Sequence, residues 1–386
     1  MGIIVKRVLL CLQFSMRPAA IIILGPTSSG KTVLAQTIAV SVNAPIINSD
    51  AIQVYKNLDY LSNKPSIASV HQNESGETIT LTSPERVLDT QAYANVEFIV
   101  YRVRNKTVVL NQTFSRQEFF LWLERNSLFR NRVIESDVEV ENYLFGIQTP
   151  GTNYSVANFV SDARKIVRGY GKDPYIMTGG TVFYAYHYTF GTQFTQKVTP
   201  DHIASPESPI TCTKSNFATC SKEKLIEFLS EHDPEILKII DIHNKARLLR
   251  AVQFLHETGR KFSEQYYKQG QLLDDFLLIV LQPKNRGDFV CKLDEVVADR
   301  VTSKEAMGEI ENIIAIYGDQ IKPWLRGISY EYRYSLEMYE KYWSHGVKLH
   351  ASLPEVVALQ AKERQYTKRQ MAFIRKFTRD LQERLL

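Results

Sequence analysis

The amino-acid sequence predicts an α/β fold of three layers, in which helices cover both faces of a central parallel sheet. An apolar run, Ile21–Leu24, leads into the glycine-rich segment Gly25–Thr32, and a segment with helical spacing, Val33–Ala39, follows it. Further apolar runs at Tyr175–Met177 and Phe276–Leu281 are typical of strands in parallel sheets, which are continuously hydrophobic because both of their faces are covered. Strands that alternate with helical segments in this way indicate strand–helix–strand units.

The glycine-rich segment Gly25-Pro-Thr-Ser-Ser-Gly-Lys-Thr32 matches the phosphate-loop pattern G-x-x-x-x-G-K-[ST]. In such a loop the glycines permit a tight turn, the lysine reaches the outer phosphate and the last hydroxyl binds Mg²⁺. Backbone N–H groups at the start of the following helix face the anion. We therefore expect a P-loop NTPase-like fold that binds a di- or triphosphate, with Thr32 as the metal ligand. The expected phosphate-binding residues are Gly25, Thr27, Ser28, Ser29, Gly30, Lys31 and Thr32.

A second short strand, starting at Ala44, carries Asp50 at its carboxyl end. Ligands bind at the carboxyl ends of strands in open parallel sheets. Asp50 is therefore a candidate Mg²⁺ ligand or general base, and a plain helix cap is the alternative. The strand Tyr175–Met177 runs into a second tight turn, Thr178–Thr181, and does not end in an acidic residue. The metal-binding aspartate of motor and switch ATPases is missing there, which argues against that class.

The pattern along the chain predicts a P-loop core with two insertions. Residues 67–141 alternate polar turns with β-rich runs, which indicates an inserted α+β subdomain of unknown role, and a mostly helical insertion follows later. The expected parts are an extension (1–17), the first part of the core (18–66), the α+β insertion (67–141), the second part of the core (142–195), the helical insertion (196–240), the third part of the core (241–340) and a basic C-terminal helix (341–386).

Positive charge is concentrated near the end of the chain. From Lys362 to Leu386 eight basic residues stand against three acidic ones, a surplus of +5 that equals the net charge of the whole protein. A basic face favours binding to a phosphate backbone, although a solvated helix face explains a charge run equally well. Arg247 and Arg250, one turn apart on a helix, suit bidentate phosphate contact or an ordinary pair of surface salt bridges.

Composition bounds the class and the compartment. A chain of 386 residues with 44% hydrophobic and 23% charged residues is typical of a soluble globular protein with more than one domain. The four cysteines have no C-x-x-C spacing, so neither a zinc site nor a disulfide framework is indicated; Cys212 and Cys220 either pair or stay reduced. The basic, largely apolar residues 1–17 are too short to span a membrane and suit a mitochondrial presequence or a plain extension. We expect a cytoplasmic or mitochondrial monomer.

Several segments, taken in order, resemble the tRNA dimethylallyltransferases (tRNA isopentenyltransferases). The segments that carry the resemblance are Gly25–Thr32, Asn48–Tyr55, Asn63–Pro65, Tyr154–Phe159, Gly179–Tyr184, Ala246–Ala251, Thr258–Gly259 and Arg364–Gln370. Residues 67–141 have no counterpart in compact bacterial members, and the usual Ile-Gly-Tyr is Ile328-Ser329-Tyr330 here.

The resemblance implies transfer of a dimethylallyl group from dimethylallyl diphosphate to the exocyclic amine of the adenine next to the anticodon, with Mg²⁺ as cofactor and tRNA as partner. It implies that Asp50 is the base, that Lys31 and Arg250 neutralise the leaving diphosphate and that Thr27 donates to it. The adenine would be flipped into a channel, and the helical insertion would face the tRNA. The residues implied in tRNA binding are Asp50, Ala51, Ile52, Gln53, Thr181, Arg247, Arg250, Lys368, Arg369, Gln370 and Arg375.

Three other functions are compatible with parts of the sequence. Prenyl transfer to free adenine nucleotides would use the same loop, but a mononucleotide needs no extended basic surface. A small-molecule or nucleotide kinase would bind ATP at the loop, with Asp50 activating a hydroxyl. A non-catalytic RNA-binding protein would not need Lys31, Thr32 and Asp50 intact. Which tRNAs are modified does not follow from the sequence.

Overall fold

The computed structural model describes residues 17–73, 76–83, 93–129, 139–171, 174–192, 220–264 and 270–385. The chain forms two compact units: the first combines Met1–Tyr188 with Leu273–Leu386, and the second is Thr189–Leu272. The expected presequence, apart from Arg17, lies outside the described residues. Within the part that is described, no helix is both long enough and apolar enough to span a membrane.

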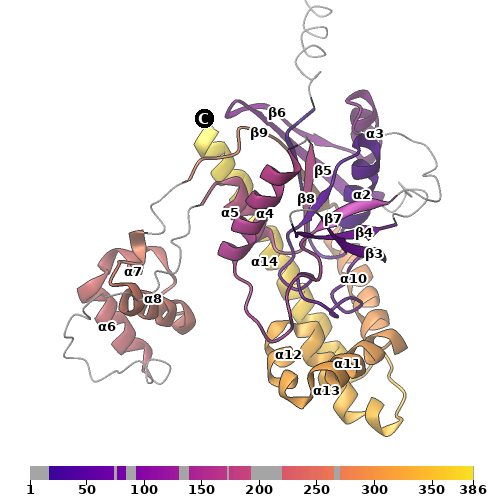
Figure 1. Cartoon of the computed structure of the whole chain (residues 1–386), viewed down its shortest axis with the longest axis vertical. Helices are drawn as coiled ribbons and strands as arrows, with labels where there is room; N and C mark the ends of the chain where they lie inside the picture. Colours follow the sequence, from indigo (N-terminus) through magenta and orange to yellow (C-terminus); the bar gives the residue numbers. More distant parts are fainter. Residues whose placement is uncertain are drawn as a thin grey trace, which may run out of the picture. The chain divides into compact units, whose positions relative to one another are not determined.

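The first unit is built on a nine-stranded sheet with the order β3-β4-β7-β2-β8-β1-β9-β5-β6 (Figure 1). The strands are β1 (Ala20–Leu24), β2 (Ile46–Asn48), β3 (Ile67–Gln72), β4 (Thr78–Thr82), β5 (Val96–Arg104), β6 (Thr107–Phe114), β7 (Val140–Tyr143), β8 (Tyr175–Thr178) and β9 (Asp275–Pro283). The five central strands, β7-β2-β8-β1-β9, are parallel, as expected. Both edges are antiparallel, so the sheet as a whole is mixed.

Helices cover both faces of this sheet, which confirms the three-layer α/β fold. The helices of this part are α2 (Lys31–Val42), α3 (Arg116–Arg125), α4 (Val156–Tyr170), α5 (Val182–Thr189), α10 (Arg286–Val301), α11 (Lys304–Tyr317), α12 (Lys322–Ile328), α13 (Tyr330–Lys341) and α14 (Pro354–Leu385), with 3-10 turns η3 (Asp319–Ile321) and η4 (Trp343–His345). Ile176 of β8 packs in one core with α2 and α3. Its neighbour Tyr175 points to the opposite face, because strand side chains alternate, and its hydroxyl lies 2.9 Å from that of Tyr188 in α5.

The strands expected to form a separate α+β insertion instead complete the central sheet. Strand β4 pairs with β7 at one edge, and β5 pairs with β9 on the other side. Helix α3 packs on the sheet through a stack of Phe98 and Phe119, whose ring centroids are 3.9 Å apart. The reason is burial: β5 has apolar side chains on both of its faces, and a strand of that kind is stable only inside a sheet covered on both sides.

The second unit is helical and larger than the expected insertion 196–240. It contains α6 (Lys222–His232), α7 (Pro234–Ile239) and α8 (Lys245–Thr258), which share one small hydrophobic core. The sequence predicts that α8 belongs to the third part of the P-loop core. The structure contradicts this, because Leu248 and Val252 of α8 are buried in the core of the second unit. Buried Asp233 accepts hydrogen bonds from the backbone N–H and the hydroxyl of Ser263, and these bonds close the unit.

Candidate active site

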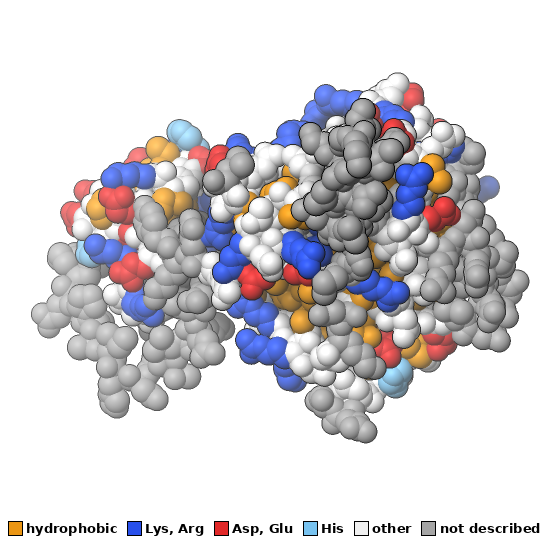
Figure 2. All heavy atoms as spheres, turned by 90° about the horizontal axis from the view of Figure 1, so that it is seen from above, with side chains coloured by type: hydrophobic (Ala, Val, Ile, Leu, Met, Phe, Trp, Pro, Cys, Tyr) orange, Lys and Arg blue, Asp and Glu red, His pale blue; other side chains and the backbone are white. Residues whose placement is uncertain are grey.

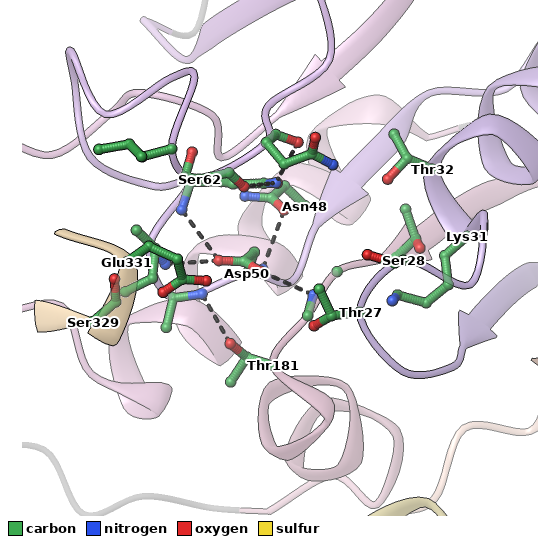
Figure 3. Close-up of a pocket in the computed structure, with 18 of the residues that line it drawn as sticks. Thr27, Ser28, Lys31, Thr32, Asn48, Asp50, Ser62, Thr181, Ser329 and Glu331 are labelled. Atoms are coloured by element: carbon green, nitrogen blue, oxygen red, sulfur yellow. Dashed lines mark hydrogen bonds between the residues drawn. The ribbon is translucent and has the colours of Figure 1, made fainter. Parts of the chain in front are cut away.

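A cavity of about 980 Å³ opens at the carboxyl ends of β1, β2 and β8 in the first unit. Three loops supply one wall: the phosphate loop after β1, the segment that begins with Asp50 after β2, and the turn Gly179–Thr181 after β8 (Figure 3). Residues of α10, α13 and α14 line the other wall. The structure therefore brings many of the predicted site residues together. Those that line the cavity are Thr27, Ser28, Ser29, Gly30, Lys31, Thr32, Asp50, Ala51, Ile52, Gln53, Thr181 and Arg369.

The phosphate loop has the backbone shape that its sequence predicts. Ser28 and Gly30 both have positive φ angles, 63° and 87°, and α2 begins directly afterwards at Lys31. The Tyr93 hydroxyl donates a 2.8 Å hydrogen bond to the Gly30 carbonyl, and a Cβ at position 30 would lie 2.8 Å from the Tyr93 ring. Glycine is therefore required at position 30 both for its backbone conformation and for the space that Tyr93 takes.

Lys31 is held inside the loop. Its Nζ donates a 2.8 Å hydrogen bond to the Pro26 carbonyl. Burial lowers the pKa of Lys31 to about 8, and the negative charge of Asp50 opposes this effect. The Ser29 hydroxyl is also buried, and it has no hydrogen-bond partner within the described residues. The loop thus carries a cation and a buried hydroxyl without a partner in the described residues, and both are groups that can donate to a diphosphate.

Asp50 faces the phosphate loop across the cavity with its carboxylate oriented by backbone groups (Figure 3). Its Oδ1 accepts hydrogen bonds from the N–H groups of Ile52 (2.8 Å) and Gln53 (3.2 Å), and its Oδ2 accepts one from Gly180 (3.0 Å). The Thr181 hydroxyl accepts a 3.0 Å bond from the N–H of Ala51. Thr181, a predicted tRNA contact, therefore also supports the segment that carries Asp50. A carboxylate oriented in this way can act as a general base.

Gln370 was expected to contact tRNA, but it is buried and joins three parts of the site. Its Oε1 accepts hydrogen bonds from the N–H (3.0 Å) and the hydroxyl (3.3 Å) of Thr27, and its Nε2 donates a 2.8 Å bond to the Gly180 carbonyl. Helix α14 thus connects the phosphate loop to the turn beside Asp50. The Thr27 hydroxyl, predicted to donate to the diphosphate, donates to Gln370 in this structure.

Sequence reasoning missed Glu309 of α11. Its carboxylate accepts hydrogen bonds from the backbone N–H groups of residues 59–61 and from the Tyr332 hydroxyl. Burial raises the pKa of Glu309, and these hydrogen bonds oppose the rise. Gln53 donates to the carbonyls of residues 62–63, next along the same loop. Glu309 therefore supports the loop against which Gln53 is held. Nothing in its local sequence signals this role, because its backbone partners at residues 59–61 lie about 250 residues away in the chain.

A pair of neighbouring carboxyl groups, the partly exposed Glu331 of α13 and the buried Glu363 of α14, was also missed. Both side chains line the cavity, and Figure 3 shows Glu331 beside Asp50. Burial, together with the negative charge of Glu331, raises the pKa of Glu363 to about 8, and burial also raises the pKa of Glu331. Arg300 and Arg369 partly offset the rise at Glu363. Two neighbouring carboxyl groups, one of them buried, favour holding a proton near neutral pH.

The basic residues of α14 divide into two groups. Lys376 and Arg379 pair with Asp380, and Arg364 pairs with Asp294. In contrast, the predicted tRNA contacts Lys368, Arg369 and Arg375 are exposed and form no ion pair within the described part of the chain. Figure 2, which views the end of the larger unit where α14 finishes, shows Lys and Arg side chains (blue) next to hydrophobic ones (orange).

Arg247 and Arg250 lie on α8 in the second unit, and both are exposed there. Neither arginine is on the buried face of α8. That face packs into the helical core and carries Leu248, Ala251 and Val252. The expected contact of Arg250 with a diphosphate stays a prediction.

Comparisons with known proteins identify the family of the chain. A model of the IPP transferase family matches residues 132–377, and a model of the isopentenyl transferase family matches residues 18–83. The tRNA dimethylallyltransferase of Bacillus licheniformis is 25% identical over 371 residues, which cover 93% of this chain and 88% of the relative. That of Fusobacterium nucleatum is 24% identical over 302 residues, covering 78% and 74%.

Among solved structures, a eukaryotic dimethylallyltransferase acting on tRNA is similar with a TM-score of 0.55 and 17% identity, over 92% of this chain and 70% of that one. This likeness supports the fold. The match to the first family model extends over more than half of the chain. The chain belongs to the IPP transferase family.

Proposed function

We propose that this protein transfers a dimethylallyl group from dimethylallyl diphosphate to the exocyclic amine of the adenine next to the anticodon of a tRNA. The observation that carries the proposal is the cavity itself, in which a phosphate loop and an oriented carboxylate, Asp50, face one another. Membership of the IPP transferase family and relatives named tRNA dimethylallyltransferase support the same reaction.

The phosphate loop would hold the leaving diphosphate. Its N–H groups, the Lys31 ammonium and the Ser29 hydroxyl would stabilise the negative charge that grows as the carbon–oxygen bond breaks. Thr32 lines the cavity, and the described residues contain no cluster of three His, Cys, Asp or Glu side chains suited to a metal ion. Mg²⁺ needs few protein ligands beside a diphosphate, since phosphate oxygens and water complete its shell. Thr32 thus fits as its protein ligand, and the ion would supply further positive charge.

Asp50 would act as the general base. The lone pair of the adenine amine forms a bond to C1 of the dimethylallyl group, and the C1–O bond breaks with its electrons left on the diphosphate. The amine proton passes to Asp50, whose carboxylate is kept in place by the N–H groups of Ile52, Gln53 and Gly180. General-base catalysis contributes about 10²- to 10⁴-fold to a rate.

The RNA backbone would bind along α14. Lys368, Arg369 and Arg375 are exposed without ion-pair partners in the described part of the chain, so their charge is available to phosphates. Arg369 also lines the cavity, and it links the helix surface to the site. An adenine inside a stem-loop must leave its stack to reach Asp50, as is usual for enzymes that modify bases.

The test is a transfer assay with dimethylallyl diphosphate in which tRNA, AMP and ATP are offered in parallel, and products are digested to nucleosides and weighed by mass spectrometry. We expect prenylated adenosine from tRNA alone. Prenylated AMP or ATP would instead place the protein with enzymes that act on free nucleotides. ATP consumption without prenylation would favour a kinase and overturn the proposal.

The role of Asp50 is tested with Asp50→Asn in the same assay. We expect kcat to fall by about 10²- to 10⁴-fold, while binding of the tRNA is retained. The exposed Asp274→Asn variant is the matched control and should keep full activity. Full activity of Asp50→Asn would remove Asp50 from the mechanism.

A further inference from the structure

Phe183 of α5 is unusually exposed for a phenylalanine, with 44% of its surface accessible to solvent. Two rings border it: His187 with centroids 4.2 Å apart at an interplanar angle of 76°, and Phe373 of α14 at 5.8 Å and 65°. Both meet Phe183 at steep angles, so neither lies flat against it. Exposed aromatic faces of this kind are what nucleobases stack on in proteins that bind single-stranded nucleic acids.

Phe183 does not line the cavity, but it lies close in the chain to residues that do. Thr181, two residues earlier, lines the cavity and binds the N–H next to Asp50. Phe373 lies one helical turn beyond Arg369, which also lines the cavity, and residues at that spacing share a helix face. The contact between Phe183 and Phe373 therefore lies where α5 and α14 leave the cavity.

The charges around this aromatic pair suit RNA. Arg369 lies one helical turn before Phe373 on the same face of α14, whereas Arg375, two residues after Phe373, belongs to another face; Arg369 is exposed without an ion-pair partner within the described residues. Lys376, by contrast, is engaged with Asp380 and lies 5.0 Å from the centroid of the Tyr186 ring, so it is not available to a ligand in the same way. A hydrophobic face beside an exposed guanidinium group complements a base whose neighbouring phosphate is held by an arginine.

We propose that Phe183 is a stacking platform for the unpaired nucleobase that neighbours the target adenine in the RNA. This rests on the proposed transfer to tRNA and adds a residue that selects an RNA loop over a free nucleotide. When the adenine leaves its stack, the neighbouring base loses a partner, and Phe183 replaces that partner at the mouth of the cavity. The reaction at Asp50 itself does not use Phe183.

The first experiment measures KM for an anticodon stem-loop RNA and for dimethylallyl diphosphate. Phe183→Ala removes the ring on which the base stacks. Loss of that stacking free energy should raise KM for the RNA by roughly 5- to 100-fold. KM for dimethylallyl diphosphate should stay unchanged. Phe183→Tyr should restore the wild-type value, whereas Phe183→Leu, which keeps bulk but has no ring face, should not. Val357→Ala, at a 51% exposed residue of α14 that does not line the cavity, is the matched control.

A second measurement reports stacking directly. Two stem-loop RNAs are compared: one carries 2-aminopurine on the 5′ side of the target adenine, and the other carries it on the 3′ side. The fluorescence of 2-aminopurine is quenched when this base stacks. We expect the wild-type protein to quench one of them and Phe183→Ala to lose that quenching. Provided that the wild type transfers the group to tRNA, any one of three results would overturn the inference. These are an unchanged KM for the RNA in Phe183→Ala, a wild-type KM in Phe183→Leu, and equal quenching by the wild type and Phe183→Ala. Absence of tRNA transfer by the wild type would instead overturn the proposed function.

Discussion

Gly180→Ala tests how the position of the Asp50 carboxylate controls catalysis. Gly180 does not have a left-handed backbone, so alanine is acceptable to the main chain at this position. The added Cβ, however, would lie 2.4 Å from Asp50 Oδ2, well inside van der Waals contact. The carboxylate must rotate away and lose the 3.0 Å hydrogen bond from the Gly180 N–H. The substitution therefore acts on Asp50 while leaving its charge in place.

The size of the effect follows from that hydrogen bond. A hydrogen bond to a charged group is worth about 1.5–3 kcal/mol, which corresponds to a decrease in kcat of roughly 10- to 150-fold. The affinity for dimethylallyl diphosphate, measured by calorimetry, should change little, because the residues of the phosphate loop are untouched. The assay is single-turnover prenyl transfer to tRNA at saturating concentrations of both substrates.

Gly308→Ala is the matched control. Gly308 lies within α11, and a Cβ there would meet no atom within 4 Å. We expect full activity and a gain of about 0.4–1 kcal/mol in the free energy of unfolding, because alanine loses less backbone entropy in a helix than glycine. If Gly180→Ala retained the wild-type kcat, the orientation of Asp50 would not matter, and the argument for it as the base would fail.

Two further predictions concern pH. Lys31, with a pKa of about 8, is protonated below pH 8, so the Kd for dimethylallyl diphosphate should rise above pH 8 by at most about tenfold per pH unit. Lys31→Met should bind dimethylallyl diphosphate weakly, and its Kd should not depend on pH in this range. If calorimetry gave the same pH slope of Kd for Lys31→Met and the wild type, the assignment of that slope to Lys31 would be wrong. Glu363 has its pKa raised from 4.5 to about 8, so the folded state binds its proton more tightly than the unfolded state does. Stability from this group is therefore full below pH 4.5 and lost as the pH rises to 8, by on the order of 1 kcal/mol per unit. Thermal unfolding of Glu363→Gln between pH 5 and 8 should show a flatter profile than that of the wild type, and parallel profiles would refute this.

Much of the site was predictable because its signals are local. The phosphate loop is a run of eight residues whose spacing alone dictates the turn, and the segment predicted as helical, Val33–Ala39, lies within α2 (Lys31–Val42). Asp50 was identifiable because it ends a short strand, and strand ends in parallel sheets gather at one edge. Four of the five central parallel strands, β1, β2, β8 and β9, were predicted in the sequence, whereas β7 (Val140–Tyr143), which is not a continuous apolar run, was not.

The edge strands show where such reasoning ends. Strands β4 and β5 were recognised as strands from their composition, but composition does not say which partner a strand pairs with. The structure places them on opposite sides of one sheet, beside β7 and β9, because both need cover for their apolar side chains. The boundary of the helical unit was also decided by burial, since Leu248 of α8 packs into the core of that unit.

The sequence by itself determined the fold class, the phosphate loop, the candidate base and the basic helix, because each is written in residues close together in the chain. Only the tertiary structure decided what supports them. Gln370 reaches Thr27 across 343 residues, Glu309 holds residues 59–61 from a distant helix, and Glu331 meets Glu363 inside the cavity. A hydrogen bond or a pKa shift depends on atoms a few ångströms apart, and no local pattern encodes that proximity until the chain has folded.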